Sequence, residues 1–263
     1  MINWTRKELK DRAKNGLRIY YGPAFAVSLL SMFLAGSSGA AGSGGTVVTF
    51  SQMQPELADM GLNPVEIATF LMAFFTTFLI TFAITTVIQT FIGNVISVGS
   101  CRFYMESRVN QRSAGVSRLF WGFTCGHYMN EVKILFLMNV KIFLWSLLLF
   151  VPGIIKSYEY RMIPYILSEN PGIDTKDAFA LSKELMDGNK WAVFVLDLSF
   201  FGWAFLAAAL GMLLQRMVFF NILSMGLFAM LPTCMLAPYI SATNAELYGR
   251  MRLSLIHNSE PTR

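Results

Sequence analysis

Long apolar runs alternate with short charged segments along the chain, and the runs have the length of membrane-spanning helices. Such a helix needs about 20 predominantly apolar residues. Runs with few or no charged side chains cover residues 19–35, 67–101, 132–151, 154–168, 191–214 and 217–245. The pattern therefore predicts an all-α polytopic transmembrane helical bundle with about six spans.

Two of these runs have unusual lengths. Residues 67–101 carry no charge for 35 residues, which is roughly 50 Å of helix against about 30 Å of hydrocarbon. This run either tilts and continues into the cytoplasm or breaks near Gly93-Asn94. Residues 154–168 are short and charged, and are either a fourth, polar span or a re-entrant helix. Pro152-Gly153 is expected to end the span before them sharply.

The N-terminus predicts an amphipathic helix over residues 5–16. Thr5 and Glu8 have the spacing of a capping box, which starts a helix. Leu9, Ala13 and Leu17 recur every four residues, so that one stripe is apolar while basic residues face elsewhere. We expect this helix to lie on the inner membrane surface, the alternative being a charged helix that is merely solvated.

A second amphipathic helix is predicted over residues 174–187. Asp174 is expected to cap its N-terminus, and Gly188 is expected to end it. Ala178, Leu181 and Leu185 share one face, so this helix is also expected at the inner surface.

Charge sets the expected orientation. The net charge is +5, and residues 1–18 alone hold six basic and two acidic residues. The loop at 36–64 has no Lys or Arg, whereas basic residues gather at 102–118, at 169–190 and at Arg250 and Arg252. Because cytoplasmic loops carry the excess of Lys and Arg, both termini are predicted to be cytoplasmic, and the flexible loop at 36–64 is predicted to be extracytoplasmic. The expected partner of the basic N-terminus is the anionic lipid of the inner leaflet rather than nucleic acid.

Composition and motifs exclude the familiar catalytic classes. The chain of 263 residues is 54% hydrophobic and 14% charged, against about 25% charged residues in soluble domains. It contains no phosphate-binding loop, zinc-protease helix or hydrolase elbow. Its three cysteines form no metal-binding or redox pair, and His127 stands alone in the body of the chain. We therefore expect no enzyme, no cofactor, no metal, and no catalytic residues.

The informative residues are the charges inside the predicted spans. An unpaired charge at a span centre costs about 2.5–3.5 kcal/mol on insertion scales. The candidate intramembrane charge network is Lys141, Lys156, Glu159, Arg161 and Asp197. We expect Asp197 to face the bundle interior and to pair with Arg161 or Lys141. Such a pair either holds spans together or lines a substrate or proton path, and interfacial snorkelling is the third interpretation.

One stretch resembles a known family. Residues 151–167 read VPGIIKSYEYRMIPYIL, and they are followed by Glu169-Asn170-Pro171, by Gly188-Asn189-Lys190 and by LSFFGW at 198–203. This order resembles the signature of the uncharacterised bacterial membrane-protein family called domain of unknown function 975. The resemblance is strong over roughly residues 130–205. It implies a six-span protein of the bacterial cytoplasmic membrane and no known activity, and Arg161 stands where the family suggests a small residue such as Ser.

The chain is expected to divide into a basic N-terminal helix at 1–18, a membrane domain at 19–252 and a tail at 253–263. The tail, LSLIHNSEPTR, resembles the translation of a transposase sequencing-library adapter, with Asn258 as the one departure. If the resemblance holds, the tail is an artefact and His257 is no ligand candidate.

Two functions are consistent with this pattern. The first is a non-enzymatic membrane scaffold or an accessory, stress-related protein, supported by the absent catalytic motifs and the two amphipathic helices. The second is a small-molecule or lipid transporter that uses the mid-membrane charges. A water-accessible cavity lined by Asp197, Arg161 and Glu159 would favour transport.

Overall fold

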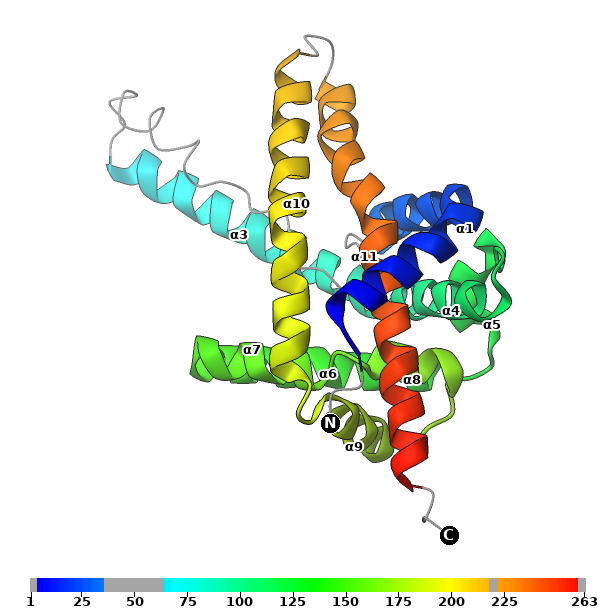
Figure 1. Ribbon diagram of the computed structural model, residues 1–263. Helices are drawn as coiled ribbons and strands as arrows, with labels where there is room; N and C mark the ends of the chain where they lie inside the picture. Colours follow the sequence, from blue (N-terminus) through cyan, green and yellow to red (C-terminus); the bar gives the residue numbers. More distant parts are fainter. Residues whose placement is uncertain (1–3, 36–63, 218–221, 260–263) are drawn as a thin grey trace.

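The protein, in a computed structural model, is all-helical over the residues that the structure describes, which are 4–35, 64–217 and 222–259. Figure 1 shows the helices radiating from a packed centre. The longer helices are α1 (Arg6–Ala35), α3 (Pro64–Ile88), α4 (Asn94–Asn110), α6 (Tyr128–Leu148), α10 (Lys190–Met217) and α11 (Ile222–Ser259). The shorter ones are α5 (Trp121–Thr124), α7 (Phe150–Glu159), α8 (Ile163–Glu169) and α9 (Thr175–Met186), with a 3-10 turn at Val116–Phe120.

The α1 helix joins the predicted N-terminal helix to the first predicted span. A non-helical residue, Tyr20 (φ −128°, ψ 27°), divides it. Pro23 explains the kink, because its ring excludes the carbonyl of residue 19 and it has no N–H to donate. The predicted cap is present, since the Glu8 backbone N–H donates to the Thr5 hydroxyl over 3.3 Å. The kink therefore lies close to the expected boundary between the two segments.

The apolar stripe of α1 faces protein. Leu9, Ala13 and Leu17 are all buried, in one core cluster with Phe103 of α4 and Tyr248 of α11. The expectation that this stripe lies against the bilayer is therefore wrong, because other helices already cover it. The basic residues Arg6, Lys7, Lys14 and Arg18 remain exposed, together with polar residues such as Asp11 and Asn15.

The long uncharged run is interrupted, close to the predicted break. A π-helical turn, Gln89–Gly93, separates α3 from α4. The side chains described in α3 are exposed apart from Phe74, whereas most of those in α4 are buried. The turn therefore marks the point where an exposed apolar helix enters the packed centre.

The region after the third predicted span differs from expectation. The α6 helix ends at Leu148, and Leu149 alone, in an extended conformation, links it to α7. Pro152-Gly153 therefore does not end a span but lies in the first turn of α7. This position suits proline, because the N–H groups of a first helical turn have no partner inside the helix.

The α9 helix matches its prediction in detail. Asp174 caps it by accepting from the Lys176 backbone N–H over 3.1 Å, and Gly188 follows its end with φ +69°. Ala178, Leu185 and Met186 are buried. This apolar face therefore packs on the protein, as in α1, and is not free for a membrane surface.

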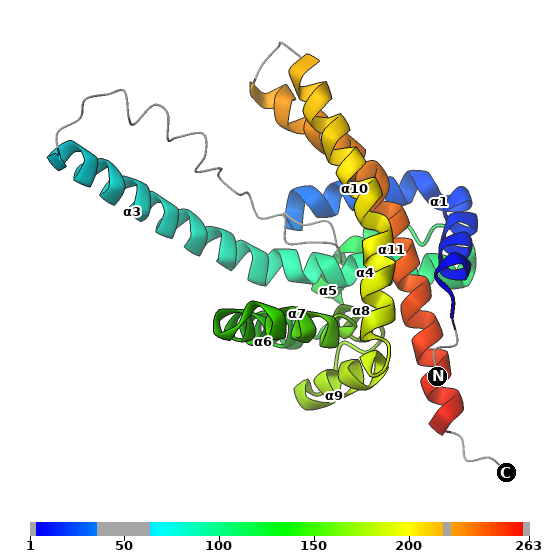
Figure 2. The ribbon, with the colours of Figure 1, turned by 60° about the vertical axis from the view of Figure 1, so that its left-hand side comes forward.

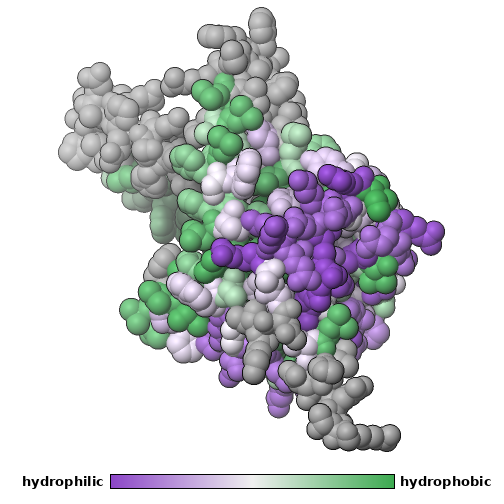
Figure 3. All heavy atoms as spheres, in the orientation of Figure 1, coloured by the Kyte–Doolittle hydropathy of each residue, from purple (hydrophilic) through white to green (hydrophobic). Residues whose placement is uncertain are grey.

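We call the packed centre the hub; it consists of the first half of α1, α4, α5, α8, α9 and the second half of α11. Three apolar arms leave it: α3, the tip of the α6–α7 pair, and α10 with the first half of α11 (Figures 1 and 2). Figure 3 shows hydrophilic side chains gathered over the hub and hydrophobic ones along the arms. The chain thus separates polar and apolar surface between two regions.

Candidate functional site: charged residues at the α7–α8 turn

Arg161 lies in the turn between α7 and α8, and it binds Asp197 of α10 through both terminal nitrogens. Arg161 Nη2 donates to Asp197 Oδ1 over 2.8 Å, and Nη1 donates to Oδ2. The Tyr158 hydroxyl donates to the same Oδ2 over 2.8 Å. The structure thus contains the pair that the sequence suggested, in the bidentate geometry typical of strong Arg–carboxylate pairs.

The same guanidinium reaches a third helix. Arg161 Nη2 also donates to Asn244 Oδ1 of α11 over 3.2 Å. The Arg161 side chain is only 11% exposed, whereas that of Asp197 is 30% exposed. One buried cation therefore ties the α7–α8 turn to both helices of the α10–α11 pair.

Glu159 forms a separate ion group next to this pair. Its Oε2 accepts from Lys156 Nζ over 2.9 Å and from Lys190 Nζ over 3.4 Å. The Ser182 hydroxyl of α9 donates to the Glu159 backbone carbonyl over 2.8 Å. Two lysines share one carboxylate oxygen, so this group carries excess positive charge.

Lys141 does not join Asp197. Its Nζ lies 3.6 Å from the ring centroid of Phe179 and 5.9 Å from that of Tyr160. Lys156 Nζ approaches the same Tyr160 ring, at 5.8 Å. Of the five candidate residues, the structure therefore joins Arg161 to Asp197 and Lys156 to Glu159, and places Lys141 on aromatic faces.

This arrangement is suited to holding helices together. The carboxylates of Asp197 and Glu159 each accept from a cation, and a proton-transfer site would instead need a group with a pKa matched to its task. Among the described residues, no group of three or more His, Cys, Asp or Glu side chains could hold a metal ion.

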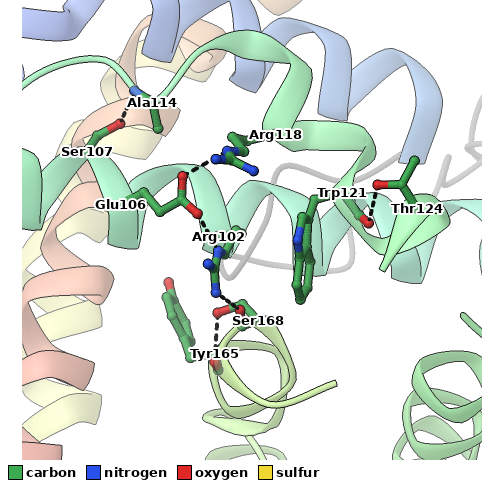
Figure 4. A network of polar contacts seen from close by, with 9 residues as sticks. All are labelled: Arg102, Glu106, Ser107, Ala114, Arg118, Trp121, Thr124, Tyr165 and Ser168. Carbon is green, nitrogen blue, oxygen red and sulfur yellow. Dashed lines mark hydrogen bonds and ion pairs between the residues drawn. The ribbon is translucent and has the colours of Figure 1, made fainter. Parts of the chain in front are cut away.

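Sequence reasoning missed an ion network on α4, drawn in Figure 4. Glu106 accepts from Arg102 over 2.5 Å and from Arg118 over 2.8 Å. Arg102 also donates to the Ser168 carbonyl of α8 over 2.7 Å and lies 4.9 Å from the Trp121 ring centroid. The four-residue spacing of Arg102 and Glu106 in the sequence could have predicted their ion pair, because residues four apart are neighbours on a helix surface.

A second missed set lies at the end of α11. Arg108 binds Glu246 over 3.0 Å, and the Tyr248 hydroxyl donates to Glu169 over 2.7 Å. Arg250 pairs with Glu8, and Arg252 with Glu169. No sequence pattern links these partners, because they lie on four different helices.

A buried carboxyl, Glu131, was also missed. The Cys125 thiol donates to its Oε1 over 3.3 Å, and its Oε2 has no hydrogen-bond partner in the described part of the chain. A Cβ atom at Gly122 would come within 2.6 Å of Oε2. Burial raises the pKa of Glu131 to about 7.

A protein-family model matches part of the chain. The model of a family described as "Protein of unknown function (DUF975)" matches residues 147–254. No curated protein and no solved structure matches the chain. The matched region contains Lys156, Glu159, Arg161 and Asp197, whereas Lys141 precedes it.

Proposed function

We propose that this chain, whose residues 147–254 carry the uncharacterised DUF975 family domain, is a non-enzymatic membrane scaffold or accessory protein of the bacterial cytoplasmic membrane. The observation that carries the proposal is the exposed apolar surface of the arms. Two helical stretches, Ala68–Asn110 and Lys190–Gly211, are long and apolar enough to cross a membrane, and none of the most apolar window of the first is buried.

The exposed side chains are too large and too many for a surface in water. Phe75, Phe78 and Phe82 of α3 are each more than half exposed, and so are Trp203 and Phe205 of α10. Soluble monomers rarely expose apolar patches beyond a few hundred Å², and exposed apolar area is unfavourable in water by about 25 cal/mol per Å². Lipid would remove this penalty along both arms.

Charge supports an orientation with both termini in the cytoplasm. Arg6, Lys7, Lys14 and Arg18 of α1 are exposed, and they would face the anionic inner leaflet. The count of six crossings requires the second half of α1, α3, α10 and the first half of α11 to cross, and also requires two crossings between residues 132 and 168.

Pairing of the charges supports a structural role over a transport path. Arg161, Asp197 and Glu159 each have a charged partner, as expected of contacts that hold helices together. The partial exposure of Asp197 is the one observation that favours transport. A single-cysteine scan of residues 190–212 separates the two: a scaffold leaves positions around Asp197 unreactive to an aqueous maleimide, and a transport path makes them react.

Membrane integration is tested by extraction. We expect the expressed chain to stay in the membrane pellet after washing at alkaline pH and to be released only by detergent. Leu206, exposed on α10, provides the matched variants: Leu206→Arg should reduce the membrane-integrated fraction severalfold because an arginine is costly in lipid, and Leu206→Met should not. Release by the alkaline wash would contradict the proposal.

A further inference from the structure

The α6–α7 pair is a tight antiparallel hairpin. Leu149 is its only linking residue, and the helices touch so closely near the link that a Cβ at Gly153 would lie 2.7 Å from Ser146 Cα. Figures 1 and 2 show the two helices side by side. The chain therefore returns toward the hub immediately after reaching the link.

The end of this hairpin is apolar and exposed. Residues 142–155, which we call the tip, contain no charged side chain. Its exposed large side chains are Phe143, Leu144, Trp145, Leu147, Leu148, Leu149, Val151, Ile154 and Ile155. These side chains stay exposed although α6 and α7 pack on each other, so the tip needs an apolar environment outside the protein.

The tip is too short to cross a bilayer. Seven residues separate Lys141 from Leu148, which is roughly 10 Å of helix against about 30 Å of hydrocarbon. The whole of α7 has 10 residues, or roughly 15 Å. Both views also show the hairpin running across α10, the apolar helix beside it, rather than along it (Figures 1 and 2).

Lysines mark the base of the tip on both helices. Lys141 stands at its start on α6, and Lys156 at its end on α7. Lys156 Nζ lies 5.6 Å from the Trp145 ring centroid, and Lys190 joins Lys156 at Glu159. Two ammonium groups share the one Glu159 carboxylate, and Lys141 adds a third positive charge at the base of the tip. Trp is enriched where a protein meets lipid headgroups, and Lys is attracted to anionic lipid.

We propose that the α6–α7 hairpin inserts its tip into the cytoplasmic leaflet and returns to the cytoplasmic side, with Lys141 and Lys156 on the phosphates of anionic lipid headgroups. The inference rests on the proposed membrane location. In this topology the chain does not cross the membrane between residues 132 and 168. Four membrane crossings remain instead of six, and both termini stay in the cytoplasm. It also moves Lys141, Glu159 and Arg161 from the bilayer centre to its inner interface.

Single cysteines and a membrane-impermeant maleimide test this topology, with the unsubstituted chain as background for Cys101, Cys125 and Cys234. Leu149→Cys is placed at the tip, Ser43→Cys in the predicted outer loop and Lys183→Cys on the exposed side of α9. We expect reaction of Ser43→Cys in intact spheroplasts only, of Lys183→Cys in inverted vesicles only, and of Leu149→Cys in neither.

The outcomes separate this inference from the proposed function. Reaction of Leu149→Cys in spheroplasts means that the hairpin crosses, and reaction in inverted vesicles means that it stays in water; either result overturns the inference. If instead Ser43→Cys fails to react in spheroplasts, or the protein washes off the membrane, the proposed function and orientation fail.

The headgroup contact has its own test in nanodiscs that contain phosphatidylglycerol and phosphatidylcholine. We expect Lys141→Gln with Lys156→Gln to lower the preference for phosphatidylglycerol around the protein by about fivefold per lysine. Lys183→Gln is the matched control and should leave the preference unchanged. An unchanged preference in the double variant overturns the headgroup assignment.

Discussion

Arg161 holds three parts of the molecule because its guanidinium is planar and presents several donors at once. It contacts Asp197 of α10 and Asn244 of α11 from the α7–α8 turn. The sequence suggested Arg161 or Lys141 as the partner of Asp197, because all three residues are charged and lie inside the predicted spans, and both basic residues are opposite in sign to Asp197. It could not suggest Asn244, since an uncharged residue in a 29-residue uncharged run carries no signal of a partner.

Removing the carboxylate should therefore destabilise the fold. Asp197→Asn leaves a mostly buried guanidinium without its counter-charge, and we expect a loss of about 2–3 kcal/mol, below the 3–5 kcal/mol of a fully buried pair because Asp197 is partly exposed. Thermal unfolding in detergent measures the loss, with the exposed Asp187→Asn as control. Equal melting temperatures for the two variants would show that the pair does not hold these helices together.

Glu131 makes the stability of the folded protein depend on pH. Its pKa is raised to about 7 from the ordinary 4.5 because the side chain is buried, so the folded state keeps a proton that the unfolded state has lost. The stabilising contribution is complete below about pH 4.5 and is lost as the pH rises to about 7. Thermal unfolding between pH 5 and 8 should show this decline, and Glu131→Gln should reduce it. Parallel curves for the two proteins would contradict the assignment.

At the scale of elements, periodicity and caps predicted the single helices well. Asp174 and Gly188 bounded α9 because capping is local chemistry. Helix length left two alternatives for residues 67–101, a continuing tilted helix or a break near Gly93-Asn94, and the structure has a π-helical turn at Gln89–Gly93 within a continuing helical stretch. The link at Leu149 was not predictable in this way, because no turn residue marks it and Pro152 three residues later is the stronger signal. The sequence also could not show what the apolar stripe of α1 packs against. Leu9 and Leu17 would give the same sequence pattern whether they faced lipid or α11.

The close approach of α6 and α7 gives a prediction at the scale of elements. Gly153→Ala places a methyl group against the backbone of Ser146, and we expect it to cost about 1–3 kcal/mol because the helices must separate. Gly202→Ala is the matched control, since a Cβ there meets nothing within 4 Å and alanine favours a helix. Thermal unfolding should rank Gly153→Ala below the parent and Gly202→Ala at or above it, and the reverse order would rule out the close approach.

For the whole molecule, the apolar runs predicted an all-α protein, and the described residues are all-helical. The count of about six spans stays a prediction, and hydropathy and charge left the packing undetermined. They could not predict the crossing of α10 by the α6–α7 hairpin, because hydropathy reports how apolar a segment is and not which direction it takes. The resemblance over residues 130–205 pointed to the same family whose model matches residues 147–254, and neither gives an activity.

The end of α11 has a consequence for where the chain can be shortened. Successive helical residues are rotated by about 100°, so Glu246 and Arg250 face α4 and α1, while Tyr248 and Arg252 face Glu169 on the opposite side. We expect an expression boundary after Arg252 to keep all four contacts and yield folded protein. A boundary after Gly249 removes one contact from each side, and it should lower both the yield and the melting temperature in detergent. Equal yields from the two truncations would mean that this helix end is dispensable.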